Sequence, residues 1–185
     1  MIDYLNLPVG ADAPEIVNVV VEVPFGGVNK YEYDPKLQIF RLDRSLYSPA
    51  HFPGDYGFIP QTKAIDGEAL DILVLVENPN FCSCLLQARP IGMLEMIDRG
   101  VADQKIVAVH DNNPRYAHVK EVKDLYRHVA KEIEHFFRVY KALETAETNV
   151  VGWSTLEQTR EIIQQAMHRF AEPLSKHQSG QRMSH

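Results

Sequence analysis

Five acidic residues lie at positions that could bring them together around metal ions. Asp66, Glu68 and Asp71 fall within six residues of one another, and Asp98 and Asp103 lie five apart. Each group leads into an apolar segment of the kind that forms a buried strand. If those strands are neighbours, up to five carboxylates converge and repel one another unless a counter-charge is present. Divalent cations supply that charge, and Mg²⁺ binds one or two carboxylates together with waters and substrate phosphates.

The alternative is that these acids, which lie beside turns, are simply solvated or cap the turns. That interpretation serves equally well for any one of them, but less well for two clusters that share the same loop-to-strand layout. The calcium-loop pattern D-x-[DN]-x-[DN]-G-x₅-E is not matched, so an EF-hand is not expected.

Basic side chains at several places could supply the positive charge that a polyphosphate needs. An arginine binds phosphate as a bidentate fork and a lysine as a point charge. Lys105 follows Asp103 by two residues, so both can face the same side of a strand. Singly, each is an ordinary surface residue; together, they suit a phosphate ligand. The basic residues are Lys30, Arg44, Lys105 and Lys141, and Tyr140 lies next to Lys141 at the end of the predicted helix.

Length and composition are those of an ordinary globular protein. The chain has 185 residues, 45% hydrophobic and 24% charged, so one domain with a substantial core is expected. A net charge of −6 argues against nucleic-acid binding, but not against a phosphate ligand, because bound cations reverse the local field. We expect the domain to span residues 1–174, and the polar residues 175–185 to form a disordered tail.

A disulfide, a zinc site, a targeting segment and a membrane span all have little support in the sequence. Cys82 and Cys84 are too close for an easy disulfide, and no second cysteine pair completes a zinc site. The N-terminus has no basic region followed by a long apolar run, and no segment approaches the roughly 18 apolar residues of a membrane span. A cytoplasmic protein without membrane contacts is therefore expected.

Short strands are predicted over the first two thirds of the chain. The apolar run at 70–77 is typical of a strand buried on both faces. Residues 48–61, with three prolines and two glycines, predict a long shaped loop. The predicted strands lie at 16–23, 30–34, 37–44, 70–77, 85–98 and 105–111.

Helical periodicity replaces this pattern in the last third. Residues 124–143 carry apolar side chains at helical spacing. A second helix is expected from Ser154, because Ser154 and Glu157 make a capping-box pattern. Strands followed by two helices predict a mainly β, α+β domain: a small β-barrel with two C-terminal helices packed on it.

In this order the segments resemble those of the family I soluble inorganic pyrophosphatases. That family's signature is Asp, a small or polar residue, Asp, Pro or Glu, an aliphatic residue, Asp, an aliphatic residue; this chain has DGEALDI at 66–72. Further matching segments are VEVP, NKYEYD, RLDR, FPGDYGFIPQT, ARPIGMLEMIDRGVADQKIVAV and IEHFFRVYKALE. The resemblance implies an OB-like five-stranded barrel and hydrolysis of pyrophosphate with several Mg²⁺ ions. It also implies a homo-oligomer, a hexamer in bacterial relatives.

The resemblance also implies roles for single residues. The implied metal ligands are Asp66, Asp71, Asp98 and Asp103, with Glu22 and Glu32 at the edge of the site. The implied phosphate-binding residues are Lys30, Arg44, Lys105, Tyr140 and Lys141. Tyr56 matches a tyrosine that is hydrogen-bonded near the metals. Glu68 stands where the family has an aspartate beside the nucleophilic water, the proposed general base.

Two departures from the family concern the chemistry. The longer side chain of Glu68 moves its carboxylate by about 1.5 Å, and a misplacement of about 1 Å can cost about a hundredfold in rate. Ala69, in place of the usual proline, relaxes the backbone there. Phe52 stands where many relatives have a phosphate-binding tyrosine.

Three hypotheses follow from the sequence. The first is an active Mg²⁺-dependent pyrophosphatase. The second is an attenuated relative that binds pyrophosphate or metal, or hydrolyses another phosphoanhydride. The third, an OB-barrel that binds nucleic acid, is disfavoured by the acidic charge and by the absence of interleaved basic and aromatic patches.

Overall fold

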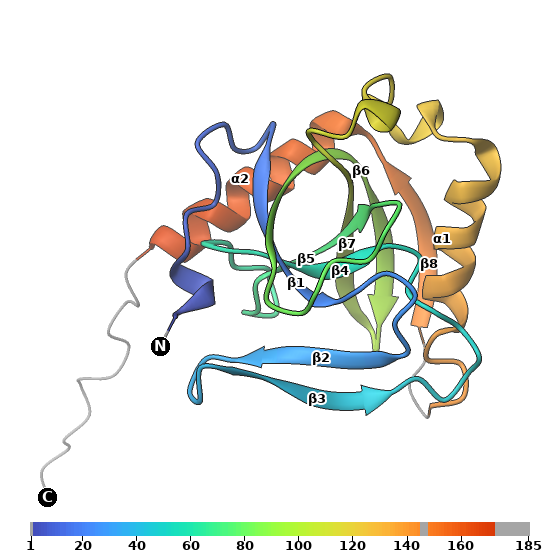
Figure 1. Cartoon of the computed structure of the whole chain (residues 1–185), viewed down its shortest axis with the longest axis horizontal. Helices are drawn as coiled ribbons and strands as arrows, with labels where there is room; N and C mark the ends of the chain where they lie inside the picture. The colour runs from blue at the N-terminus through green and yellow to red at the C-terminus, as the bar shows by residue number, and fades with distance from the viewer. Residues whose placement is uncertain (1, 145–147, 173–185) are drawn as a thin grey trace, which may run out of the picture.

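The computed structural model describes residues 2–144 and 148–172 and consists mainly of β-strands (Figure 1). Five strands form a ring in which each pairs with the next and the last pairs with the first, so the predicted five-stranded barrel is confirmed. The barrel strands are, in spatial order, β1 (Val17–Val23), β4 (Asp55–Ile59), β5 (Leu70–Leu75), β7 (Val101–His110) and β6 (Leu85–Asp98). The predicted tail at 175–185 lies outside the described residues.

The pairing of β5 with β7 determines where the acidic segments lie. These two strands are parallel, with Ile72 opposite Ile106 and Leu73 opposite Val107. Parallel neighbours begin at the same edge of a sheet, so the residues that precede the two apolar runs meet there. The metal site predicted from the sequence required the two apolar strands to be neighbours, and β5 and β7 are neighbours.

The barrel interior explains why β5 is apolar on both faces. Ile72 packs in a cluster with Ile163 and Ala166 of one helix, whereas Leu73 packs in a second cluster with Phe136 and Phe137 of the other. Side chains of successive strand residues point to opposite faces, so both faces are buried. The strand predicted at 70–77 is thereby confirmed as a doubly covered core strand.

Strand β4 corrects the prediction of a loop over residues 48–61. All five of its residues are buried, although prolines lie on either side of them. Gly57 pairs with Val21, and a Cβ at Gly57 would lie 1.9 Å from the Val20 carbonyl oxygen. The glycine that suggested a loop is thus required for close contact with β1.

The remaining strands lie outside the ring. β2 (Asn29–Asp34) and β3 (Ile39–Ser45) form a separate hairpin beside the barrel (Figure 1). β8 (Thr148–Ser154), which was not predicted, pairs with the outer edge of β6. β7 also begins four residues before the predicted strand at 105, in a hairpin with β6.

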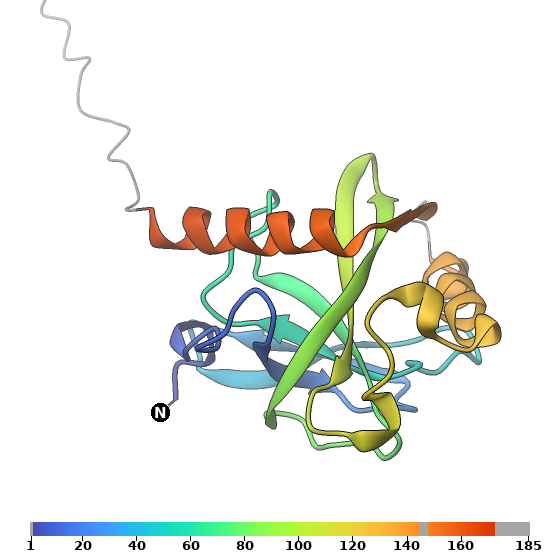
Figure 2. The same ribbon diagram turned by 90° about the horizontal axis from the view of Figure 1, so that it is seen from above.

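Two α-helices pack on different sides of the barrel (Figure 2). α1 (Arg127–Val139) is shorter than predicted, because residues 122–124 form a separate 3₁₀ turn and Tyr140 caps its end. α2 (Leu156–Ala171) begins two residues later than the start predicted at Ser154. Its capping box uses Thr155 and Gln158, not Ser154 and Glu157, since Ser154 belongs to β8 and bonds Glu95.

Three short 3₁₀ helices complete the described structure. They are η1 (Tyr4–Asn6), η2 (Pro114–Tyr116) and η3 (Val122–Asp124). Among the described residues, no helix combines the length and hydrophobicity needed to cross a bilayer.

Candidate active site

Lys105 lies between the two acidic clusters. Its ammonium nitrogen bonds Asp71 of β5 and lies 2.7 Å from Asp103 Oδ1 of β7. The whole residue is only 4% exposed. Burial disfavours a charged ammonium, but the combined attraction of Asp71, Asp103 and the neighbouring tyrosines outweighs it and holds the pKa of Lys105 well above its ordinary value. Lys105 is therefore charged and offsets part of the negative charge of the two carboxylates.

The two aspartates that it bridges differ in proton affinity. Burial opposes ionisation of Asp71, yet the charge and hydrogen bond of Lys105 lower the pKa of Asp71 below its usual value. Burial raises the pKa of Asp103, and Lys105 offsets that effect only in part. Asp71 is thus the firmly ionised member of the pair.

A loop at residues 62–70, here called the acidic loop, presents Asp66 and Glu68. Gly67 turns the loop with a φ of +94°, a conformation that favours glycine. The Asp66 carboxylate accepts a hydrogen bond from the Glu68 backbone N–H at 3.0 Å. Partial desolvation and the neighbouring Asp66 charge raise the pKa of Glu68, whose side chain remains solvent-exposed. One small cavity of about 20 Å³ is lined by four acids: Asp66, Glu68, Asp71 and Asp103.

Asp98 lies apart from that cavity and pairs with Lys141. The Lys141 ammonium is 2.7 Å from Asp98 Oδ2, and the other oxygen, Oδ1, is buried with no hydrogen-bond partner among the described residues. Tyr140, the neighbour of Lys141, is buried, and burial raises the pKa of its hydroxyl. A buried carboxylate oxygen without a partner is a suitable ligand for a cation.

Arg44 joins the β2–β3 hairpin to the segment that follows α1. Its Nε donates to Glu144 at 2.8 Å, and its Nη1 lies 2.5 Å from Asp43. Its Nη2 is buried and has no hydrogen-bond partner in the described part of the chain. Neither Asp43 nor Glu144 was predicted; the contact to Glu144 spans 100 residues, and no sequence pattern signals it.

Glu22, Lys30 and Glu32 form another side of the site. Lys30 bonds Glu32 and lies 3.8 Å from Asp43. Glu22 accepts a hydrogen bond from the Tyr33 backbone N–H at 2.8 Å, and burial raises the pKa of Glu22 to about 8. A cavity of about 480 Å³ is lined by Glu22, Lys30, Glu32, Glu68 and Asp71. It is called the larger cavity here, to distinguish it from the small cavity at the acidic loop.

Phe52 lies away from both acidic cavities. Its ring is 1% exposed and packs between Tyr56 and Phe136, with centroid distances of 5.2 and 4.8 Å. Tyr56 is buried as well, and burial raises the pKa of its hydroxyl well above the ordinary value. Phe52 therefore supports Tyr56 through packing in this structure.

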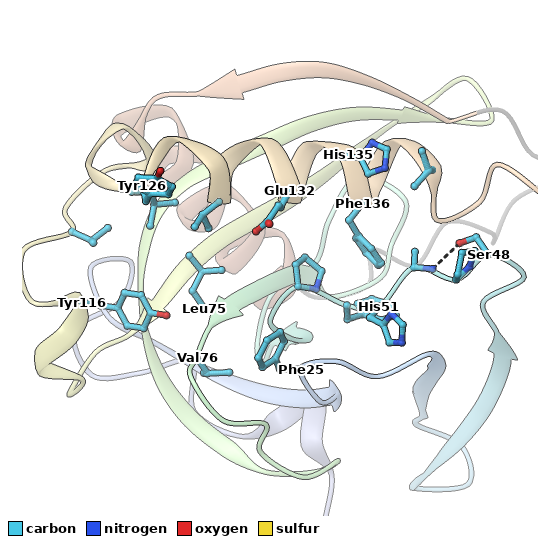
Figure 3. Close-up of a pocket in the computed structure, with 18 of the residues that line it drawn as sticks. Phe25, Ser48, His51, Leu75, Val76, Tyr116, Tyr126, Glu132, His135 and Phe136 are labelled. Carbon is cyan, nitrogen blue, oxygen red and sulfur yellow. Dashed lines mark hydrogen bonds between the residues drawn. The ribbon is translucent and has the colours of Figure 1, made fainter.

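A further cavity, of greater volume than these two, is a mainly apolar groove that contains none of the predicted site residues. It has a volume of about 990 Å³ and runs between α1 and the segment around His51 (Figure 3). Leu75, Phe136 and Tyr126 are among its lining residues. Arg115, Asp124 and Glu132 also line it, but the acidic loop and its neighbouring aspartates line the two smaller cavities.

The acidic residues fit a hard divalent cation in ligand chemistry, since carboxylate oxygens are the ligands that Mg²⁺ prefers. Among the described residues, no three carboxylate, histidine or cysteine side chains are grouped closely enough to hold an ion together. Lys105 instead bridges Asp71 and Asp103. To bind a metal ion, Asp71 and Asp103 would therefore have to exchange Lys105 for the ion as their positively charged partner.

The sequence matches a known family along most of its length. The profile of the family described as "Inorganic pyrophosphatase" matches residues 19–171. The chain belongs to the inorganic pyrophosphatase family. The resemblance noted in the sequence is thereby confirmed, together with the barrel fold that it implied.

Individual pyrophosphatases are similar over nearly their whole length. The inorganic pyrophosphatase of Nostoc sp. is 46% identical over 157 residues, which cover 85% of this chain and 93% of the relative. That of Halalkalibacterium halodurans is 42% identical, with coverage of 85% and 96%. The crystal structure of inorganic pyrophosphatase from Thermus thermophilus superposes with a TM-score of 0.89 at 41% identity, covering 91% of this chain and 99% of that one.

Within this pyrophosphatase fold, most of the predicted site residues fall into three spatial groups. Lys105 holds Asp71 and Asp103 beside the acidic loop; Lys141 holds Asp98; and Glu22, Lys30 and Glu32 line the larger cavity. Arg44 bonds Glu144 outside these groups. The individual roles of these residues remain predictions.

Proposed function

We propose that this chain hydrolyses inorganic pyrophosphate to two orthophosphates, using divalent metal ions held by its carboxylates. The observation that carries the proposal is the parallel pairing of β5 and β7 in a pyrophosphatase-family chain. That pairing brings Asp71, Asp103 and Lys105 together beside the acidic loop. Phosphoryl transfer requires mainly positioning and charge stabilisation, which such a cluster can provide.

The metal is proposed to be Mg²⁺, with several ions per site. Asp66, Asp71 and Asp103 would hold ions beside the acidic loop, and Asp98 would use its unpartnered oxygen. Glu22 and Glu32 would act at the edge of the larger cavity. When bound, the ions supply positive charge and increase the acidity of a water molecule.

Basic residues are proposed to bind the two phosphates. Three of them pair with a carboxylate of the site or its edge: Lys30 with Glu32, Lys105 with Asp71, and Lys141 with Asp98. Arg44 pairs with Glu144 outside these groups. Once released from these carboxylates, the basic side chains would be available to donate to phosphate oxygens. Tyr140, buried beside Lys141, would add a hydroxyl donor.

Glu68 is proposed as the general base. Its carboxylate lines both the small and the larger cavity, so it can reach a water held between the acids. Its raised pKa, due to partial desolvation and to Asp66, makes it a stronger proton acceptor than an ordinary glutamate. Tyr56, whose ring centroid lies 5.9 Å from the Lys105 ammonium, would donate its hydroxyl to Asp71 and favour the ionised carboxylate.

The direct test is release of orthophosphate from pyrophosphate by the purified full chain. We expect release that requires Mg²⁺, disappears in EDTA and is inhibited by excess Ca²⁺. Absence of metal-dependent release would contradict the proposal.

Glu68 also motivates a second candidate, a relative that binds pyrophosphate or metal without efficient turnover or that acts on another phosphoanhydride. Glu68 stands where the family has a shorter aspartate, at the tip of the acidic loop. Tight binding of pyrophosphate by calorimetry, together with no phosphate release, would favour this candidate.

We further propose that the chain forms a homo-oligomer, a hexamer by resemblance to bacterial relatives, and acts in the cytoplasm. Exposed apolar side chains support self-association: Tyr126 is 80% exposed and Leu143 66% exposed. Both also line the apolar groove beside α1.

A further inference from the structure

The last turns of α2 lie against the start of the acidic loop. The Lys63 backbone N–H donates to the Ala166 carbonyl oxygen at 2.9 Å. The Lys63 carbonyl oxygen accepts a hydrogen bond from Arg169 Nε at 2.8 Å. Residues about 100 positions later in the chain therefore hold the backbone on both sides of Lys63.

The base of the acidic loop is fixed from a second direction. The Thr62 hydroxyl donates to the Ile59 carbonyl at 2.6 Å and accepts from the Leu70 N–H at 2.9 Å. The Ala64 N–H donates to the Glu68 carbonyl at 2.7 Å, which closes the loop on itself. Thr62 thus ties the base to the barrel, and α2 sets the direction in which the rest of the loop extends.

Arg169 differs from the other groups that hold the loop. Among the described residues it is the one side chain outside the loop that hydrogen-bonds to the backbone of residues 63–69. Its bond ends three residues before Asp66 and five before Glu68. The end of α2 also forms a wall of the larger cavity, because Arg169 and Phe170 line it together with Glu68 and Asp71.

We propose that Arg169 is a positioning residue, which fixes the acidic loop and with it the carboxylates of Asp66 and Glu68. The inference rests on the proposed pyrophosphatase activity, since it assigns Arg169 to that reaction. A guanidinium suits this task because its planar fork donates in fixed directions. A shift of about 1 Å in a reacting group can cost about a hundredfold in rate, so an anchor at Lys63 affects turnover without touching substrate.

The test compares three variants of the full chain: R169A, R169K and R160A. R160A is the matched control, because Arg160 lies on the same helix but contacts Glu15, at 3.9 Å, instead of the acidic loop. Two readouts are used. Hydrogen exchange of the peptide covering residues 63–70 is followed in metal-free protein, and phosphate release is followed as a function of Mg²⁺.

For R169A we expect faster exchange in this peptide, about a tenfold lower kcat and a higher Mg²⁺ concentration for half-maximal activity. R169K keeps the charge but lacks the Nε–H, so its values should fall between those of wild type and R169A. R160A should match wild type in both readouts. If R169A does not fold, R169K alone must still show faster exchange and a lower kcat.

Two results would overturn the proposal. One is wild-type exchange at residues 63–70 in R169A; the other is faster exchange with unchanged kcat and Mg²⁺ dependence, which indicates an anchor without a catalytic effect. Absence of phosphate release by wild type is a different failure, since it contradicts the proposed function. The exchange experiment needs no turnover and would still decide whether Arg169 holds the loop.

Discussion

The Lys105 ammonium bonds the carboxylate of Asp71, which lies 34 residues earlier in the sequence. The contact crosses the parallel pair of strands β5 and β7. The same ammonium also lies 2.7 Å from Asp103. One lysine thus provides the positive charge at the point where the two acidic segments meet. In the proposed enzyme, divalent cations would take over this role when they bind.

Removal of Lys105 should destabilise the metal-free protein and make it dependent on Mg²⁺. K105A leaves Asp71 and Asp103 without their shared counter-charge, and breaking a buried pair costs about 3 kcal/mol. Asp71 is partly solvent-exposed, which limits the loss. Thermal unfolding should show a lower Tm for K105A in EDTA and a larger gain on adding Mg²⁺ than for wild type.

K123A is the control for that experiment. The Lys123 side chain is 73% exposed and pairs with Glu121 on the surface, so its loss should leave Tm nearly unchanged. An equal Mg²⁺ effect on K105A and wild type would contradict a metal site at Asp71 and Asp103.

Glu22 should make the metal-free protein less stable as pH rises from 5 to 8. In the unfolded chain its carboxyl ionises near the ordinary pKa of 4.5, whereas burial raises the folded-state pKa to about 8. Between these values the folded state binds more protons, so stability falls with increasing pH, by at most about 5 kcal/mol. E22Q can still accept the Tyr33 N–H but does not titrate.

Urea unfolding in EDTA at pH 5 and pH 8 checks this expectation. E22Q should lose less stability than wild type between the two pH values. Parallel losses in the two proteins would show that Glu22 is not held protonated by the fold.

The F52Y substitution should not increase activity, although it restores the residue type common in the family. Phe52 packs between Tyr56 and Phe136 and lines neither acidic cavity. A hydroxyl buried there without a partner costs about 1–3 kcal/mol, so Tm should fall. A lower KM for pyrophosphate in F52Y, at unchanged Tm, would instead place this side chain at the phosphates.

The oligomeric state can be measured by light scattering after size exclusion. A hexamer of the 21.1 kDa chain has a mass of about 127 kDa. A peak at the mass of a single chain, unchanged over a range of protein concentrations and with Mg²⁺ present, would contradict the hexamer.

The series of short strands followed by two helices was sufficient to predict a small β-barrel, and the resemblance to the pyrophosphatases implied that it has five strands. The sequence could not establish that β5 and β7 are parallel neighbours, which depends on tertiary pairing. Strand β4 was missed because its five residues stand between prolines and contain Gly57, a glycine required by the close contact with β1. Short strands in such surroundings have no periodic signal of their own.

The candidate site was predictable to the extent that local motifs define it. The acidic residues lie in recognisable segments, as do Lys105 and Lys141, which pair with them, but other contacts of the site have no such signal. Glu144 reaches Arg44 across 100 residues, and Arg169 reaches Lys63 across 106. Such contacts arise from the packing of helices and loops on the barrel, and no spacing in the sequence indicates them.

The most direct test of the account is the initial rate of phosphate release from pyrophosphate by wild type and E68D, each with Mg²⁺ and with EDTA. Glu68 lines both acidic cavities, and Ala69 leaves its backbone free to suit the longer side chain. We therefore predict Mg²⁺-dependent turnover by wild type and a slower E68D, by up to about a hundredfold, because its carboxylate is withdrawn by about 1.5 Å. No Mg²⁺-dependent release by wild type, or an E68D variant faster by orders of magnitude, would contradict the account.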